Sequence, residues 1–239
     1  MTNDQSADNN PYGNSETKEV YRQVKFIPNS KAVTLLLIRH GESAIADMEK
    51  PFPLTEGRSD PPLSPIGTLQ AQALSARLAG YQLDAIYVTQ LKRTQETAAP
   101  LCAALGQTWT MEKDLVEIFM GEWEGGIYRK YMTEGHPIAQ KILNEQRFDV
   151  IPGGESNHSV TSRAVAAIQR IAAEHAGQTL AIFTHSVVIA NILASVTHSE
   201  PFAFLGNDNA SISEVVIADK KWYLRRFNDT AHLEHIKHL

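Results

Sequence analysis

The chain reads VTLLLIRHGES from Val33 to Ser43, and this stretch decides the fold. Six apolar or β-branched residues are followed at once by Arg39, His40 and Gly41. A short apolar run of this kind is typical of a strand buried on both faces, as in a parallel sheet. Open α/β sheets bind ligands beyond the carboxyl ends of their strands, so Arg39 and His40 are expected at the mouth of a site. Because neighbouring strand residues face opposite ways, we expect a turn over Arg39–Gly41, which Gly41 permits, so that both side chains converge.

Composition limits the fold and the partners. With 239 residues, 43% of them hydrophobic, the chain suits one sizeable α/β core. A net charge of −5 argues against a nucleic acid or an anionic membrane as the main partner, although a local basic pocket can still bind a small anion. The single cysteine, Cys102, excludes an intrachain disulfide and suits a reducing compartment. No membrane-span pattern or signal peptide is visible, and we expect a cytoplasmic protein.

Helical and strand patterns alternate along the chain. Residues 1–30 are polar, and we expect a flexible N-terminal arm followed by a single domain over residues 31–239. Helices are predicted from Ser64–Pro65 to Gly80, over 91–105 with a kink or split at Pro100, over 156–176 and over 187–196. Strands are predicted over 84–89, 108–111, 115–118 and 179–184, and a hairpin over 211–218 and 222–227. The pattern indicates an α/β fold, a three-layer α/β/α sandwich with a mostly parallel central sheet, a closing β-hairpin and a helical excursion (126–150) over the site.

Polar residues follow the predicted strands, where the strand ends would share one mouth. They are, in chain order, Arg39 and His40, Arg93 after Thr89, Glu117, and His185. Two guanidiniums, two imidazoles and a carboxylate are the groups that phosphoryl transfer through a histidine requires. Taken singly, Arg93 fits an exposed helix arginine, Glu117 a solvated strand end and His185 a core histidine. Taken together, they favour an active site.

Each group has a chemical role in such a transfer. A phosphate ester carries about two negative charges near neutral pH, and arginine forks such as Arg39 and Arg93 bind its oxygens in pairs. A histidine attacks phosphorus through an unprotonated nitrogen, and cationic surroundings favour that state. The leaving alkoxide needs a proton, which suits Glu117, because a carboxyl beside a phosphate dianion has a raised pKa. Amides at the start of the helix after His185 could add donors.

A series of motifs in fixed order resembles the histidine phosphatase superfamily, the phosphoglycerate mutase-like family. The motifs are RHGES (39–43), DPPLSPIGTLQA (60–71), TQLKRTQET (89–97), EIFMGEWEG (117–125), residues 152–156 with Arg163, FTHS (183–186) and FNDTAHL (227–233). The resemblance implies that His40 is the nucleophile that becomes phosphohistidine and that Glu117 is the general acid and then the base. It places Arg39, Ser43, Arg93, His185 and Ser186 at the phosphate. It implies no metal and no cofactor, because the arginines take the electrostatic role that Mg²⁺ plays elsewhere.

Departures from the family pattern bear on the branch. The mutase branch commonly has an asparagine seven residues after the RHGE arginine, where this chain has Ala46, and mutases carry an HYG-type stretch in place of EIFMGEWEG. The second histidine is usually followed by glycine, whereas this chain has Ser186, whose side chain is expected to narrow the pocket. The resemblance therefore implies a metal-independent phosphomonoesterase that acts on a small phosphorylated metabolite. The alternatives are a phosphoglycerate mutase-type isomerase and a catalytically inactive module that binds phosphorylated ligands.

Two further signals have a structural and a functional interpretation. His232, His235 and His238 recur every third residue, which could suggest a metal site, but they lack the HExxH pattern and His232 fits the C-terminal motif. Trp123 could stack on a substrate, but a packing role next to Glu117 is the favoured interpretation.

Specificity is expected from residues 44–62 and 126–150, whose conformation the sequence does not determine. Four basic residues of the second segment could contact another anionic group of the substrate, although solvation is the commoner fate of such residues. They are Arg129, Lys130, Lys141 and Arg147. The identity of the substrate and the oligomeric state stay open.

Overall fold

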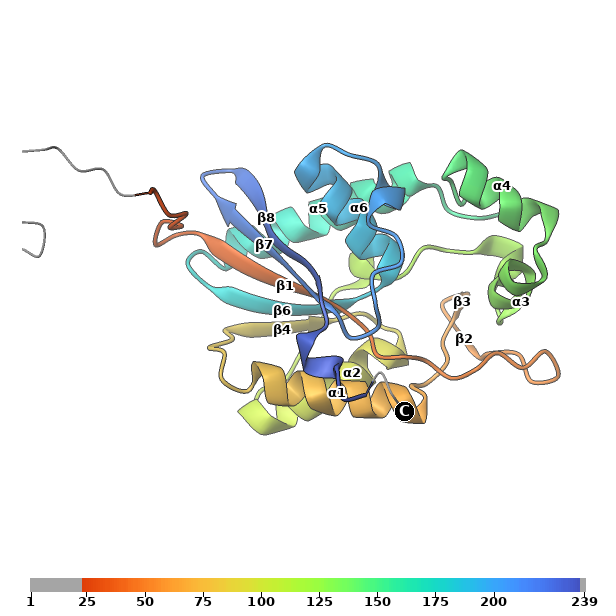
Figure 1. Cartoon of the computed structure of the whole chain (residues 1–239), viewed down its shortest axis with the longest axis horizontal. Helices are drawn as coiled ribbons and strands as arrows, with labels where there is room; N and C mark the ends of the chain where they lie inside the picture. Colours follow the sequence, from red (N-terminus) through yellow and green to blue (C-terminus); the bar gives the residue numbers. More distant parts are fainter. Residues whose placement is uncertain (1–22, 237–239) are drawn as a thin grey trace, which may run out of the picture.

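The computed structural model describes residues 23–236 and has a six-stranded sheet at its centre (Figure 1). In sheet order the strands are β5 (Thr110–Met111), β4 (Ala85–Val88), β6 (Thr179–Thr184), β1 (Val33–Arg39), β7 (Ile212–Ala218) and β8 (Lys221–Asp229). The strands from β5 to β1 pair in parallel, whereas β7 pairs antiparallel with β1 and β8 antiparallel with β7. The predicted mostly parallel sheet and closing hairpin are confirmed.

Helices cover both faces of the sheet and complete the predicted three layers. One face carries α1 (Pro65–Leu78) and α2 (Lys92–Leu105), and the other carries α5 (Asn157–Glu174) and α6 (Ser186–Thr197) (Figure 1). The two faces of β1 divide accordingly: Leu36 and Ile38 belong to the core under α1 and α2, and Leu35 and Leu37 to the core under α5 and α6. Each such fully buried side chain contributes about 1.5–3 kcal/mol. Burial on both faces explains why β1 is a continuous apolar run.

The predicted helix starts are also confirmed. Ser64 precedes α1, and its hydroxyl accepts a hydrogen bond from the amide of Gly67 at 3.0 Å, with Pro65 as the first helical residue. Ser156 caps α5 through the amide of Ser159 at 3.2 Å. The buried face of α5 consists of the predicted positions Val160, Ala164, Ala167, Ile168 and Ile171.

The structure differs from two local predictions. Of the kink or split expected at Pro100, the split does not occur: α2 runs through Pro100 without interruption. The carbonyl that loses its partner at Pro100 belongs to Glu96, an exposed residue whose backbone can be solvated. The strand over 115–118 does not form either: a short 3₁₀ helix, η1 (Lys113–Leu115), leads into an irregular segment.

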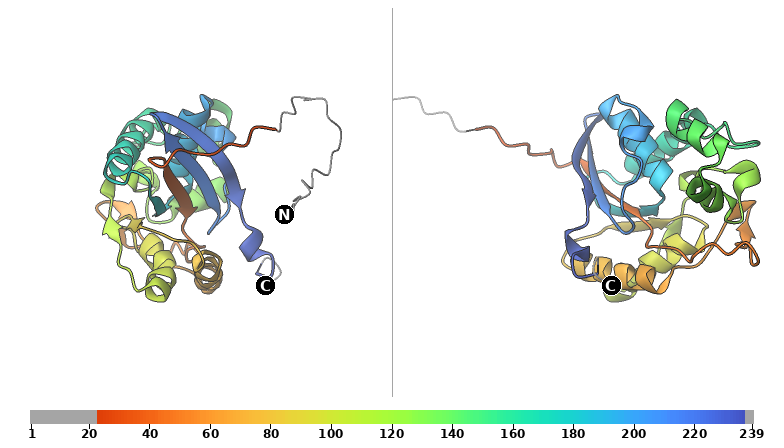
Figure 2. Two further views of the ribbon diagram at one scale, coloured as in Figure 1. Left: turned by 90° about the vertical axis from the view of Figure 1, so that its left-hand side faces the viewer. Right: turned by 45° about the vertical axis from the view of Figure 1, so that its right-hand side comes forward.

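The segments expected to set specificity lie together at one end of the molecule. The loop over 44–62 contains a small hairpin of β2 (Leu54–Thr55) and β3 (Arg58–Ser59), and residues 126–150 form α3 (Ile127–Glu134) and α4 (Pro137–Glu145). Figure 2 shows α3 and α4 near the β2–β3 hairpin, beyond the carboxyl ends of β1 and β6. The short 3₁₀ helices η2 (Gly121–Trp123), η3 (Pro201–Ala203) and η4 (Ala231–Leu233) lie in connections. We call residues 44–62 and 126–150 the cap, and the helical excursion is confirmed.

The predicted arm falls mostly on residues 1–22, which lie outside the described range. Its remainder contacts the closing hairpin, because the ring of Phe26 lies 5.0 Å from that of Tyr223 and Asn29 donates to Asp219 at 2.9 Å. Between residues 23 and 236, the structure contains no helix with the length and apolar character needed to cross a membrane.

Candidate active site

His40 directly follows β1 and is 6% exposed. Its Nδ1 lies 2.7 Å from the carbonyl oxygen of Gly41, and its Nε2 lies 3.1 Å from Nε of Arg93. A carbonyl only accepts and a guanidinium only donates, so Nδ1 carries the proton and Nε2 holds the lone pair. Burial, Arg93 and Arg39 together hold the pKa of His40 well below its ordinary value. His40 is therefore a neutral imidazole whose unprotonated nitrogen is defined by its neighbours.

The turn after His40 rests against helix α1. The Gly41 amide donates to Thr97 Oγ1 at 2.9 Å. A Cβ on Gly41 would lie 2.7 Å from the carbonyl oxygen of Gly67, and one on Gly67 would lie 2.0 Å from that of Glu42. Gly41 is not among the residues with positive φ, so its glycine serves close backbone approach rather than a left-handed turn.

Two arginines reach His40 from different elements. Arg39 ends β1, and its Nη1 donates to the carbonyl of Asn207. Arg93, in the first turn of α2, is 7% exposed and donates through Nη1 to the carbonyl of Ser59 at 2.8 Å. Burial lowers the pKa of Arg93 to about 10. Neither arginine forms an ion pair within 4 Å with a described carboxylate, so both retain charge that an anion can neutralise.

His185 follows β6, the parallel neighbour of β1, and lies beside His40. Its ring is fully buried and 5.3 Å from the ring of His40. Its Nε2 lies 3.0 Å from Thr89 Oγ1, while its Nδ1 has no partner among the described residues. Burial holds the pKa of His185 well below its ordinary value, and Arg93 and His40 lower it further. We call Arg39, His40, Arg93 and His185 the floor of the site.

Glu117 lies on the irregular segment between η1 and η2 rather than at a strand end. Its Oε1 accepts from the amide of Ile118 at 3.0 Å, and its own carbonyl accepts from Nε of Arg58 at 3.0 Å. Burial raises the pKa of Glu117 against the opposing effects of Arg93 and Arg39. A carboxyl with a raised pKa keeps its proton to a higher pH than a free glutamate does, which suits a general acid.

Arg163 of α5 holds the segment that carries Glu117. Its Nη1 donates to the carbonyls of Asp114 and Val116, each at 2.7 Å. Its Nε pairs with Glu155 at 2.9 Å, and the other oxygen of Glu155 accepts from the amide of Phe119 at 3.1 Å. The backbone is thus fixed on both sides of Glu117 without regular secondary structure.

A pocket of about 320 Å³ brings most of the predicted site residues together. Arg39, His40, Ser43, Arg93 and Glu117 all line it. His185 and Ser186 do not: His185 is fully buried beside His40, and the carbonyl of Ser186, the first residue of α6, accepts from Asn207 at 3.2 Å. The narrowing of the pocket expected from Ser186 is therefore not observed.

The pocket also has residues that the sequence did not single out. Arg58 and Tyr128 come from the cap, and Asn209 donates to the carbonyl of His40 at 3.0 Å. Burial raises the pKa of Tyr128 to about 12. The sequence marked the cap segments as a whole, but nothing in a polar loop distinguishes one arginine or asparagine from another. Asn209 had no signal at all.

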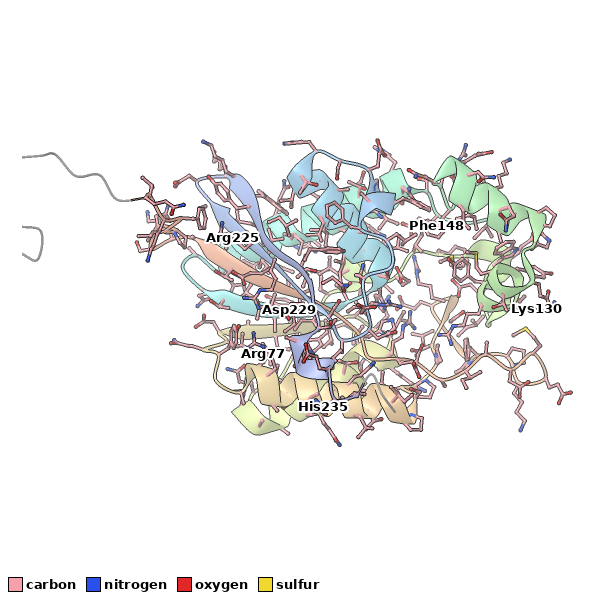
Figure 3. The ribbon with its side chains drawn as sticks, in the orientation of Figure 1. Arg77, Lys130, Phe148, Arg225, Asp229 and His235 are labelled. Atoms are coloured by element: carbon pink, nitrogen blue, oxygen red, sulfur yellow. The ribbon has the colours of Figure 1, made fainter. Side chains whose placement is uncertain are left out.

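Arg129 is the one basic residue of the 126–150 segment that lines the pocket. The other three named from the sequence pair with nearby acids, Lys130 with Glu134, Lys141 with Glu145, and Arg147 with Asp149. Figure 3 labels Lys130 on α3, at the end of the molecule that the cap occupies. Trp123 is 4% exposed and packs against Tyr131 at 5.0 Å, which agrees with a packing role, although it also lines the pocket.

The histidine series near the C-terminus does not form a metal site within the described range. Over residues 23–236 no group of three or more His, Cys, Asp or Glu side chains could hold a metal ion, and His238 lies outside that range. His232 instead makes a contact of 3.1 Å with the carbonyl of Ala210.

Comparisons with known proteins show the family of the chain. The family model of the histidine phosphatase superfamily (branch 1) matches residues 35–230. Phosphoserine phosphatase 1 of Hydrogenobacter thermophilus is 31% identical over 204 residues, which cover 84% of this chain and 94% of the relative. Metal-independent phosphoserine phosphatase of Arabidopsis thaliana is 29% identical over 211 residues, covering 87% and 86%. The solved structure of Bacillus stearothermophilus YhfR superimposes with a TM-score of 0.72 at 28% identity, covering 84% of this chain and all of that one.

Proposed function

This chain belongs to branch 1 of the histidine phosphatase superfamily, and we propose that it hydrolyses the phosphomonoester of a small phosphorylated metabolite, without a metal ion, through a phosphohistidine at His40. The observation that carries the mechanism is the geometry of the His40 ring. Its proton is held on Nδ1 by Gly41, and its Nε2 lone pair lies next to Arg93 in the wall of the pocket.

The first half-reaction begins when the phosphoryl group takes the donors of the floor. Nε of Arg93, which donates to His40 Nε2, turns its N–H to a phosphoryl oxygen and frees the lone pair for attack. Arg39, which also lines the pocket, provides further donors, and His185 lies beside the His40 ring at 5.3 Å. The Nε2–P bond forms as the P–O bond to the leaving group breaks, and Glu117 protonates the departing oxygen.

The second half-reaction returns the enzyme to its starting state. Glu117, now a carboxylate, accepts a proton from water while the water oxygen attacks phosphorus. The N–P bond breaks, inorganic phosphate forms, and His40 is again neutral. The guanidiniums stabilise the charge on the equatorial oxygens in both steps. In this scheme residues 31–239 act as one catalytic domain. The proposed compartment is the cytoplasm.

Phosphate release in the presence of EDTA tests this function. The panel should contain p-nitrophenyl phosphate, small phosphorylated metabolites and 3-phosphoglycerate, with His40→Ala as the control. Release by the wild type alone is the expected result. Interconversion of phosphoglycerates with a bisphosphate primer, without release, would make the protein a mutase. Binding of phosphorylated ligands with neither activity would leave a binding module.

A further inference from the structure

Besides the two arginines of the floor, two arginines of the cap line the pocket. Arg39 and Arg93 come from β1 and α2, beside His40, whereas Arg58 and Arg129 come from the cap. The cap arginines cannot both be explained by the phosphoryl group, because that group already takes the donors beside His40. The contacts that each cap arginine makes within the protein show which of them has a structural role.

Arg58 makes structural contacts with the segment that carries Glu117. Its Nε donates to the carbonyl of Glu117, its Nη2 lies 3.7 Å from Glu155, and its guanidinium lies over the ring of Phe119 at 5.5 Å. It has a carboxylate partner and a structural task. A second role for Arg58 is not needed to explain its position.

Arg129 has only neutral partners. Its Nη1 donates to the carbonyl of Ala44, its Nη2 donates to Ser43 Oγ at 2.7 Å, and its guanidinium lies over the ring of Phe52 at 5.0 Å. Among residues 23–236 it forms no ion pair within 4 Å, unlike Lys130 beside it. These contacts hold the guanidinium in the pocket wall, between α3 and the loop that follows the RHGE motif.

Arg129 adds a positive charge to a pocket wall that already holds Arg39 and Arg93. Its charge acts on Arg39, His40 and Arg93, and lowers the pKa of each of them. Partial burial of its guanidinium lowers the pKa of Arg129, and the nearby carboxylate of Glu42 opposes this effect. Cations held this close repel one another, and an anion bound among them removes that repulsion.

We propose that Arg129 binds a second anionic group of the substrate, a carboxylate carried a few atoms from the phosphoryl group. This proposal rests on the proposed function and narrows its substrate to phosphorylated carboxylic acids. The planar fork of one guanidinium matches the two oxygens of a carboxylate. A second phosphoryl group fits this place less well than a carboxylate. Its two negative charges would meet one arginine, and Glu42 and Glu124 also line the pocket wall.

Matched substrate pairs test the proposal. O-phosphoserine and O-phosphoethanolamine differ only by the carboxylate, and 3-phosphoglycerate differs from glycerol 3-phosphate by carboxylate in place of a hydroxymethyl group. The wild type should prefer the carboxylate member of at least one pair by roughly ten- to a hundred-fold in kcat/KM, the range expected for a charged hydrogen bond. Arg129→Gln should bring that ratio close to one, mainly through KM.

Two further variants separate recognition from folding. Arg129→Lys keeps the charge but loses the fork, and should retain part of the preference. Lys130→Gln, which changes the neighbouring residue outside the pocket, should retain all of it. A wild-type ratio near one for both pairs, an unchanged ratio in Arg129→Gln, or an equal loss on both members of a pair would overturn the proposal.

Failure of the proposed function gives a different pattern. If no ester releases phosphate, binding calorimetry with 3-phosphoglycerate and glycerol 3-phosphate decides the question of Arg129 separately. Tighter binding of 3-phosphoglycerate that is lost in Arg129→Gln would support the carboxylate site in a protein that is not a phosphatase. Equal binding of the two compounds would overturn it.

Discussion

The floor and the cap are built differently, although both contribute residues to the same pocket. The floor residues stand at the ends of adjacent parallel strands or in the first turn of α2, and His40, Arg93 and His185 are buried. The cap residues come from a two-residue hairpin strand and a short helix, and Arg129 is an exposed residue. In the proposed function, regular secondary structure thus fixes the nucleophile and the phosphate-binding groups, while irregular segments and short helices carry Glu117 and the groups that select a substrate. Substitutions in the floor should therefore reduce turnover of every substrate, whereas substitutions in the cap should change the preference among substrates.

The largest effect is expected at the centre of the floor. Replacing His40 with glutamine removes the nucleophile, and we expect turnover to fall by roughly 10⁴-fold or more on every substrate. Initial rates by phosphate release, with circular dichroism to check the fold, provide the measurement. A variant that folds and keeps more than about a hundredth of the activity would contradict the role of His40.

Glu117 belongs to neither the floor nor the cap. The loss of activity on its replacement should depend on the leaving group of the substrate. Glu117→Gln should slow alkyl phosphates by roughly 10²–10³-fold but p-nitrophenyl phosphate far less, because nitrophenolate departs without a proton. Glu122→Gln changes an exposed residue nearby and provides the control. Equal losses on both esters would remove Glu117 from the role of acid.

Arg163 should transmit its effect through Glu117. Arg163→Gln removes the donors to the carbonyls of Asp114 and Val116, and we expect roughly a ten-fold loss on alkyl phosphates with a smaller one on p-nitrophenyl phosphate. Arg170→Gln is the matched control, because Arg170 also extends from α5 and pairs with Asp114 at 3.2 Å, but on the surface. A uniform loss on both esters would indicate a general structural role instead.

The smallest effect concerns stability and pH. The folded pKa values of His40 and His185 lie well below the ordinary value of 6.5, so on acidification the unfolded chain binds protons that the folded chain does not. Stability should therefore fall as the pH decreases through 6.5, by up to about 1.4 kcal/mol per pH unit for each ring. Urea unfolding between pH 7.5 and 5.5 measures this slope.

Two histidine variants test the pH prediction further. His40→Gln should flatten the slope, because one buried neutral imidazole is gone. His198→Gln, at an exposed helix end, provides the control for simple loss of a histidine. An unchanged slope in His40→Gln would show that His40 does not titrate as its burial requires.

The sequence predicted that the floor residues would lie together, because the strands that build the sheet also bring their carboxyl ends side by side. The apolar run of β1 identifies a doubly buried strand, and the next residue is then necessarily at its carboxyl end. Glu117 was predicted in the right place on the wrong element, since Arg163 rather than a strand holds its backbone. The capping serine Ser64 gave the start of α1 correctly, because that signal is local.

The cap was less predictable because long-range contacts determine it. Its helices were expected, but which basic residue enters the pocket depends on contacts with a loop some 85 residues earlier, as for Arg129 and Ala44. The hairpin of β2 and β3 is too short for a period-two pattern. Asn209 reaches His40 from a connection that has no sequence signal.

The central claim is that the phosphoryl group passes through His40, and the stereochemical course at phosphorus tests it most directly. Hydrolysis of a phosphate ester made chiral with oxygen isotopes would give inorganic phosphate whose configuration can be read. Two successive in-line displacements, first by His40 and then by water, predict net retention. Inversion would mean that water attacks the substrate directly, and would contradict the phosphohistidine intermediate.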